Sequence, residues 1–65
     1  MLNHKKGKNE GLFFILDGYL LVATVEVTPM IVYKHYHVNI VDDKYRKEVA
    51  AYVEKNFTNE RFYMN

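Results

Sequence analysis

The chain contains no cysteine, so neither a disulfide nor a thiolate zinc site can stabilise it. At 65 residues it is expected to form a single small domain spanning residues 1–65. Domains of this size bury a limited share of their surface and usually depend on a disulfide, a metal or a partner chain for extra stability. Because 49% of the residues are hydrophobic, we expect the extra burial to come from association with another chain.

An excess of one charge is also missing, since nine basic residues stand against eight acidic ones and the formal net charge is +1. Such a balance argues against strong binding to a nucleic-acid backbone, which usually requires a dense basic surface. No apolar run is long enough to span a bilayer, and the N-terminal residues lack the apolar stretch of a signal peptide. We therefore expect a cytoplasmic protein with no membrane partner.

Motifs of common catalytic sites are absent as well. The sequence has no G-x-S-x-G nucleophile elbow, no phosphate-binding glycine loop and no cysteine nucleophile. A chain this short also has little room for a cleft that excludes water. We predict that the protein is not an enzyme and that it binds no cofactor or metal.

The first two thirds of the chain divide into a polar segment and a segment in which apolar and polar residues alternate. Residues 1–10 are polar and lysine-rich, and are expected to form a flexible basic arm. Residues 11–41 alternate between apolar and polar positions as strands do, and are predicted to form an antiparallel β-meander. Pro29 interrupts the alternation and marks a connection between two strands.

Asp17-Gly18 is predicted to be the turn of a hairpin, because these residue types tolerate the positive φ that a type I′ turn needs at both central positions. The turn decides which side chains share a face, since a shift of one residue sends every side chain to the other face. It predicts three cross-strand pairs: Leu16 with Tyr19, Phe14 with Leu21, and Leu12 with Ala23.

Residues 43–57 are predicted to form a helix, because apolar residues recur there at helical spacing and form a stripe that can pack against the sheet. Asp42 or Asp43 is a suitable N-cap. Residues 58–65 form a tail whose aromatic residues allow for a short fourth strand. The sequence thus predicts an α+β fold, in which a three-stranded antiparallel sheet is covered on one face by a C-terminal helix. The apolar stripe of the predicted helix consists of Tyr45, Val49, Tyr52, Val53 and Phe57.

The predicted pairing divides the strands into two faces. One face, which includes Leu12, Phe14 and Leu16, is expected to pack against the helix. The other face is also apolar near the hairpin turn, although a single helix can cover only one side of the sheet. Because exposed apolar patches mark interfaces, we predict a self-association surface there, as in a homodimer. Its residues are Phe13, Ile15, Leu20, Val22, Tyr33, His35 and His37.

Two alternatives use the histidines of that face. With Glu26 or His4, the pair His35 and His37 could contribute to a metal site, but nothing in the sequence fixes such a geometry. A sheet surface with aromatic and imidazole rings could instead stack the bases of single-stranded nucleic acid. The residues for that alternative are Lys5, Lys6, Lys8, Tyr33 and His35.

The functional prediction is a small, non-enzymatic protein–protein interaction module. Its apolar surplus, its lack of disulfides and its balanced charge all favour this interpretation. We expect it to act as an inhibitor, regulator or accessory subunit, as a homodimer or on a larger protein. Small inhibitors from phages and mobile elements have a similar size, which is an analogy only. The alternative is single-stranded nucleic-acid binding.

Overall fold

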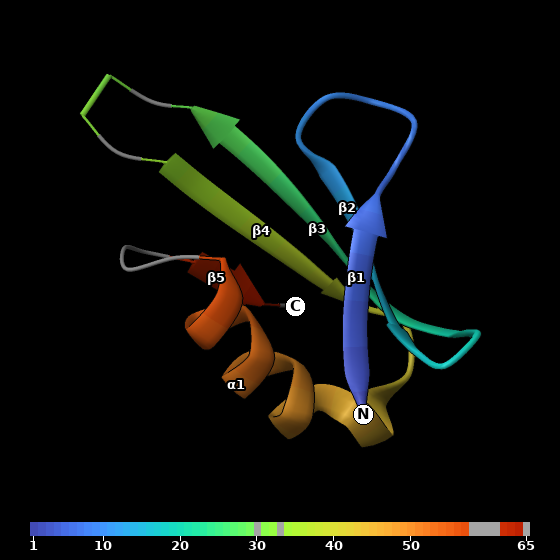
Figure 1. Cartoon of the computed structure of the whole chain (residues 1–65). Helices are drawn as coiled ribbons and strands as arrows, with labels where there is room; N and C mark the ends of the chain where they lie inside the picture. The colour runs from blue at the N-terminus through green and yellow to red at the C-terminus, as the bar shows by residue number, and fades with distance from the viewer. Residues whose placement is uncertain (30, 33, 58–61, 65) are drawn as a thin grey trace.

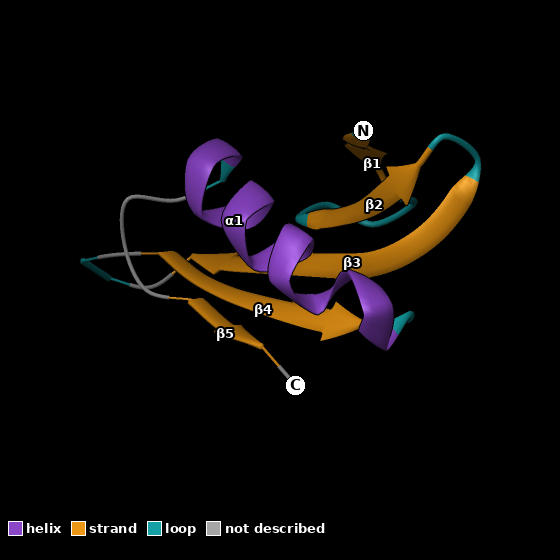
Figure 2. Cartoon of the chain, turned by 90° about the horizontal axis from the view of Figure 1, so that it is seen from below, coloured by secondary structure: helices purple, strands orange, loops and turns teal. Residues whose placement is uncertain are grey.

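A computed structural model describes residues 1–29, 31–32, 34–57 and 62–64 of the chain. Within them, one sheet contains five strands whose spatial order follows the chain, β1-β2-β3-β4-β5, and the helix α1 covers one face of it (Figure 2). The predicted α+β class is therefore confirmed. The elements are β1 (Leu2–Lys6), β2 (Leu12–Asp17), β3 (Leu20–Pro29), β4 (Lys34–Ile40), the 3₁₀ turn η1 (Asp43–Tyr45), α1 (Arg46–Asn56) and β5 (Phe62–Met64).

The strand β1 occupies the place where the sequence predicted a flexible basic arm. It pairs antiparallel with β2 along its whole length, from Leu2 opposite Asp17 to Lys6 opposite Phe13. The antiparallel part of the sheet therefore has four strands rather than three. Polar and lysine side chains are common on edge strands because they discourage pairing with a strand of another chain, and they give such a strand the composition of a solvated tail. For β1, the prediction of a flexible arm over residues 1–10 is wrong.

The hairpin of β2 and β3 forms where it was predicted, but its turn lies one residue further along the chain. Asp17 pairs with Leu20, so Gly18 and Tyr19 form the loop. Gly18 has a φ of 64°, and no described residue other than glycine has a positive φ. This pattern fits a type II′ turn, which has glycine at its first central position. The predicted pairs are therefore wrong: Leu16 lies opposite Leu21, Phe14 opposite Thr24, and Leu12 opposite Glu26.

The irregular pairing beyond the turn, rather than the displaced turn itself, exchanges the two faces of β2 relative to β3. Ile15 is fully buried, and Phe13 packs against the same core. A β-bulge in the pairing between Ile15 and Leu16 brings both Val22 and Ala23 of β3 into the core. Because side chains alternate along a strand, the residues predicted to face the helix face away from it. They are Leu12, Phe14 and Leu16.

The core lies between the sheet and α1. Val49 and Val53 are the buried residues of α1, while Tyr45, Tyr52 and Phe57 pack at the margin of the core. The predicted helical stripe is confirmed, since all of its residues contribute to this packing. The buried side chains are Ile15, Val22, Ala23, Val25, Tyr36, Val38, Val49 and Val53.

The helical segment begins at a capped aspartate. The side chain of Asp42 accepts a hydrogen bond from the backbone N–H of Lys44 at 3.1 Å, as expected for an N-cap. Helical structure then runs from Asp43 to Asn56, close to the predicted range of 43–57. The helix serves as the crossover that allows β5 to lie parallel to β4. The sequence had left open a short strand in the tail, and β5 is that strand. Residues 58–61 and 65 of the tail lie outside the described residues.

Candidate interaction surface

The residues predicted to form an interface do not share one surface. Ile15 and Val22 are each 0% exposed and belong to the core, and Phe13 packs against it. None of these three can centre an exposed patch, because α1 covers the face toward which they point. The error has one cause, the β-bulge between Ile15 and Leu16, which exchanged the faces of β2 relative to β3. Leu20 is half-exposed beside the turn.

His35 and His37 lie on the side of β4 that faces away from α1. His35 is half-buried opposite Thr28, and His37 is exposed opposite Glu26 of β3. Among the residues that the structure describes, no group of three or more histidine, aspartate or glutamate side chains could hold a metal ion. Tyr33, which was predicted beside them, lies outside the described residues.

The sheet face opposite α1, which we call the outer face, has an apolar half and a polar half. The apolar half lies on β2 and the adjoining end of β3, where Leu12, Phe14 and Leu16 are half-buried and Leu21 is 37% exposed. No described helix lies over this face (Figure 2). The sequence predicted an uncovered apolar face with Phe13 and Ile15 of β2, whereas the uncovered face carries Leu12, Phe14 and Leu16 of that strand. Its polar half consists of Thr24, Glu26, His35, His37 and Asn39.

Opposite charges flank the apolar strip of the outer face. On one side, Lys5 of β1 lies opposite Phe14. On the other side, Glu26 of β3 lies opposite Leu12. Both charged side chains are exposed. The outer face thus presents a lysine, a strip of leucine and phenylalanine, and a glutamate on three successive strands.

One signal in the sequence could have identified this surface. The run from Leu12 to Ile15 is apolar at every position, so either choice of hairpin register leaves apolar side chains on the side without a helix. Lys5 was named only for the nucleic-acid alternative and was assigned to a flexible arm, whereas pairing of β1 fixes it on the outer face. The surface could be predicted from the pattern, but its members depended on the register.

On the other side of the sheet, His4 ties β1 to α1. Its Nδ1 atom lies 2.7 Å from the hydroxyl of Tyr52. The imidazole centroid lies 4.6 Å from that of Phe57 and 6.0 Å, edge to face, from that of Phe13. These contacts hold the ring between strand and helix. The sequence placed His4 on a mobile arm, where it was one possible further ligand in the metal-site alternative, whereas the structure gives it aromatic neighbours and a tyrosine hydroxyl.

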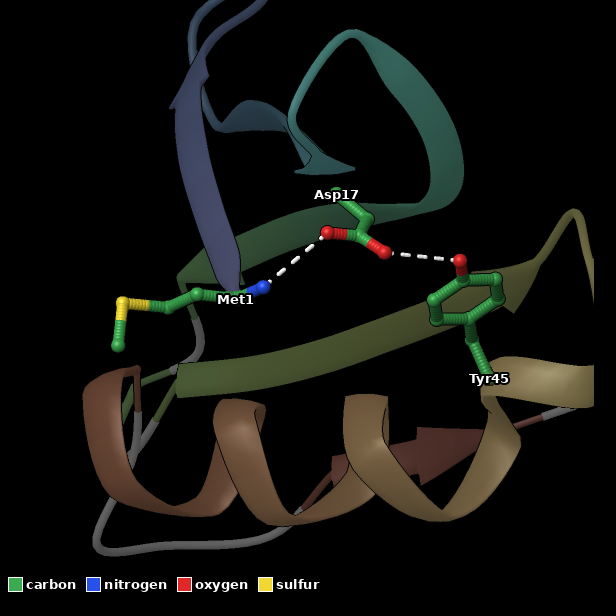
Figure 3. A network of polar contacts seen from close by, with 3 residues as sticks. All are labelled: Met1, Asp17 and Tyr45. Carbon is green, nitrogen blue, oxygen red and sulfur yellow. Dashed lines mark hydrogen bonds and ion pairs between the residues drawn. The ribbon is translucent and has the colours of Figure 1, made fainter.

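A second polar contact joins the β2–β3 hairpin to the start of the helix (Figure 3). The hydroxyl of Tyr45 donates a hydrogen bond to Oδ2 of Asp17 at 2.8 Å, and the α-amino group of Met1 lies 3.2 Å from Oδ1. The hydrogen bond from Tyr45 and, after it, the ammonium of Met1 lower the pKa of Asp17. The same hydrogen bond raises the pKa of the Tyr45 hydroxyl. The network favours an ionised Asp17 and a protonated Tyr45.

No protein-family model matches the chain, and no curated protein or solved structure matches it either. Within the described residues, no helix is long and apolar enough to cross a membrane. Function is therefore inferred from the geometry of the surfaces of the protein itself.

Proposed function

We propose that the protein is a small, non-enzymatic interaction module that forms a homodimer through its outer face. The observation that carries the proposal is that β2 is apolar on both faces, while α1 covers only one of them. Ile15 points into the core, whereas Leu12, Phe14 and Leu16 lie on the uncovered side. In this proposal the dimer acts on a larger protein as an inhibitor, regulator or accessory subunit.

Burial of the outer face would be a substantial gain for a domain of this size. Full burial of a large apolar side chain is worth roughly 1.5–3 kcal/mol. Because Leu12, Phe14 and Leu16 are already half-buried, each would contribute about 1 kcal/mol more in a dimer. With Leu21 included, the total of a few kcal/mol per copy approaches the whole stability of a small domain.

The charges of the outer face favour a second copy of the same chain as the partner. A two-fold axis that passes between Leu12 and Phe14 sets Lys5 of each copy opposite Glu26 of the other. The contact is then self-complementary, with an apolar strip at its centre and two identical ion pairs at its sides. Such pairs fix the orientation and the partner more than they add to the affinity.

The test is a charge exchange followed by sedimentation equilibrium over a range of protein concentrations. Lys5→Glu and Glu26→Lys are each expected to raise the dimer dissociation constant about tenfold or more, because each places like charges opposite one another. The double variant Lys5→Glu/Glu26→Lys should recover most of the wild-type affinity. Lys47→Glu, a charge reversal at an exposed position near the start of α1, serves as the control and should leave the constant unchanged.

Two outcomes would overturn the proposal. One is a wild-type chain that stays monomeric at every concentration. The other is a double variant that is no better than its single parents, although circular dichroism shows all of them folded. If the two single variants and the control Lys47→Glu all weaken dimerisation equally, the effect comes from net charge and not from the proposed orientation of the two copies.

Single-stranded nucleic acid is the second candidate, and the arrangement of its residues favours it less. Lys5 shares the outer face with Phe14 and His37, but Lys6 lies opposite Phe13 and therefore on the α1 side. Lys8 belongs to the turn between β1 and β2. A fluorescence anisotropy titration with single-stranded oligonucleotides would distinguish the candidates, since Lys5→Glu should then abolish binding while the protein remains monomeric.

A further inference from the structure

The connection between β3 and β4 carries apolar side chains that project away from the rest of the protein. Ile31 is 101% exposed and Val32 is 85% exposed. The strand that leads to them, β3, has 10 residues and is the longest strand described, so it carries this connection beyond the end of β2 (Figure 1). Two adjacent β-branched side chains in this position add nothing to the core, and exposed apolar groups of this kind indicate a binding partner.

Lysines lie at the end of the sheet that carries the β3–β4 connection. Exposed Lys6 ends β1, and exposed Lys8 lies in the turn between β1 and β2, together with the acidic residue Glu10. This turn lies beside the end of β3, because the backbone N–H of Val27 donates to the carbonyl of Gly11 at 2.7 Å. Figure 1 shows both connections at one end of the sheet and the β2–β3 turn at the other. At that other end, Asp17 ends β2, and Asp42 and Asp43 follow the end of β4.

We propose that this end of the sheet binds the surface of an anionic lipid bilayer, with Ile31 and Val32 inserted at the interface. A protruding pair of aliphatic side chains can enter a lipid interface without a matching pocket, and nearby lysines attract the anionic headgroups. Lys6 and Lys8 are placed for that role.

Such binding needs no segment that spans the bilayer. The sequence predicted no membrane partner because it contains no segment long enough to span a bilayer. That argument does not apply to binding at the surface of a bilayer. The proposal is also independent of the homodimer, because Ile31 and Val32 lie beyond the paired strands and take no part in the outer face.

The experiment is co-sedimentation of the whole chain with vesicles of phosphatidylcholine, with or without about one third phosphatidylserine. We expect binding to the anionic vesicles, weaker binding to the neutral ones, and a loss of affinity as salt is added. The variant Ile31→Ser/Val32→Ser should lose about tenfold or more in affinity for the anionic vesicles. Lys6→Gln/Lys8→Gln should weaken binding to the anionic vesicles while changing binding to the neutral ones little.

The matched control is Tyr19→Ser/Leu20→Ser, which removes apolar side chains that are 104% and 50% exposed at the opposite hairpin turn. This control should bind anionic vesicles as the wild type does, and circular dichroism should show every variant folded. Failure of the wild type to sediment with anionic vesicles would overturn the proposal, as would an equal loss in the control. An Ile31→Ser/Val32→Ser variant with unchanged vesicle binding but altered mass in solution would assign the tip to a protein contact instead.

Discussion

At the scale of single residues, Asp17 explains how one carboxylate can connect segments that are distant in sequence. It ends β2 next to the turn, accepts a hydrogen bond from Tyr45 at the start of the helical segment, and lies beside the α-amino group of Met1. The sequence assigned this aspartate a role only in the turn, because Tyr45 is 28 residues away and its contact depends on the folded chain. Local patterns identify turns and caps, but they contain no information about such a partner.

Replacing Tyr45 with phenylalanine should raise the pKa of Asp17 toward its ordinary value of 3.8, because the largest cause of the lowered pKa is removed. A folded-state pKa below the unfolded one stabilises the protein above about pH 4, and this contribution is lost as the pH falls through the folded-state pKa. The difference in melting temperature between wild type and Tyr45→Phe should therefore be largest near neutral pH and shrink in acid. Carbon-detected NMR titration gives the pKa directly, with the exposed Tyr19→Phe as the control. An unchanged pKa would contradict the assignment.

At the scale of elements, α1 allows a test that separates its two sides. Val53→Asp buries an unpaired charge against the sheet, and should cost about 3 kcal/mol or more of unfolding free energy. Arg46→Ala removes an exposed ion pair with Asp43 at 2.9 Å, and should change the unfolding free energy by about 0.5 kcal/mol or less. Urea unfolding monitored by circular dichroism measures both. Similar losses for the two variants would mean that the buried side of α1 is misassigned.

The elements also show what the sequence could predict. The helix was predicted with its buried stripe because both follow from spacing within one segment, from Tyr45 to Phe57. The hairpin was located by Asp17-Gly18, yet its turn lies one residue further along the chain, since that dipeptide serves two turn types. A β-bulge beyond the turn, which no local pattern marks, shifts the pairing again and exchanges the faces of β2. The strand β1 was missed because a polar edge strand and a solvated tail have the same composition.

At the scale of the whole molecule, a small core makes stability sensitive to association. The homodimer proposed for the outer face links folding to protein concentration, because only folded chains can associate. We therefore expect the wild-type melting temperature to rise with concentration. The variant Lys5→Glu should melt at a lower temperature that depends less on concentration. Scanning calorimetry over a range of concentrations measures both, and a wild-type melting temperature independent of concentration would contradict the proposal.

Because the order of the strands in space follows their order in the chain, folding has few long loops to close. Each strand from β1 to β4 lies beside its neighbour in sequence, so pairing can proceed one hairpin at a time at a small cost in loop-closure entropy. Contacts of β1 and β2 with the helical segment are the exceptions, since His4 and Tyr52 are 48 residues apart and Asp17 and Tyr45 are 28 apart. Packing the helix against the meander is then the step that closes the longest loops.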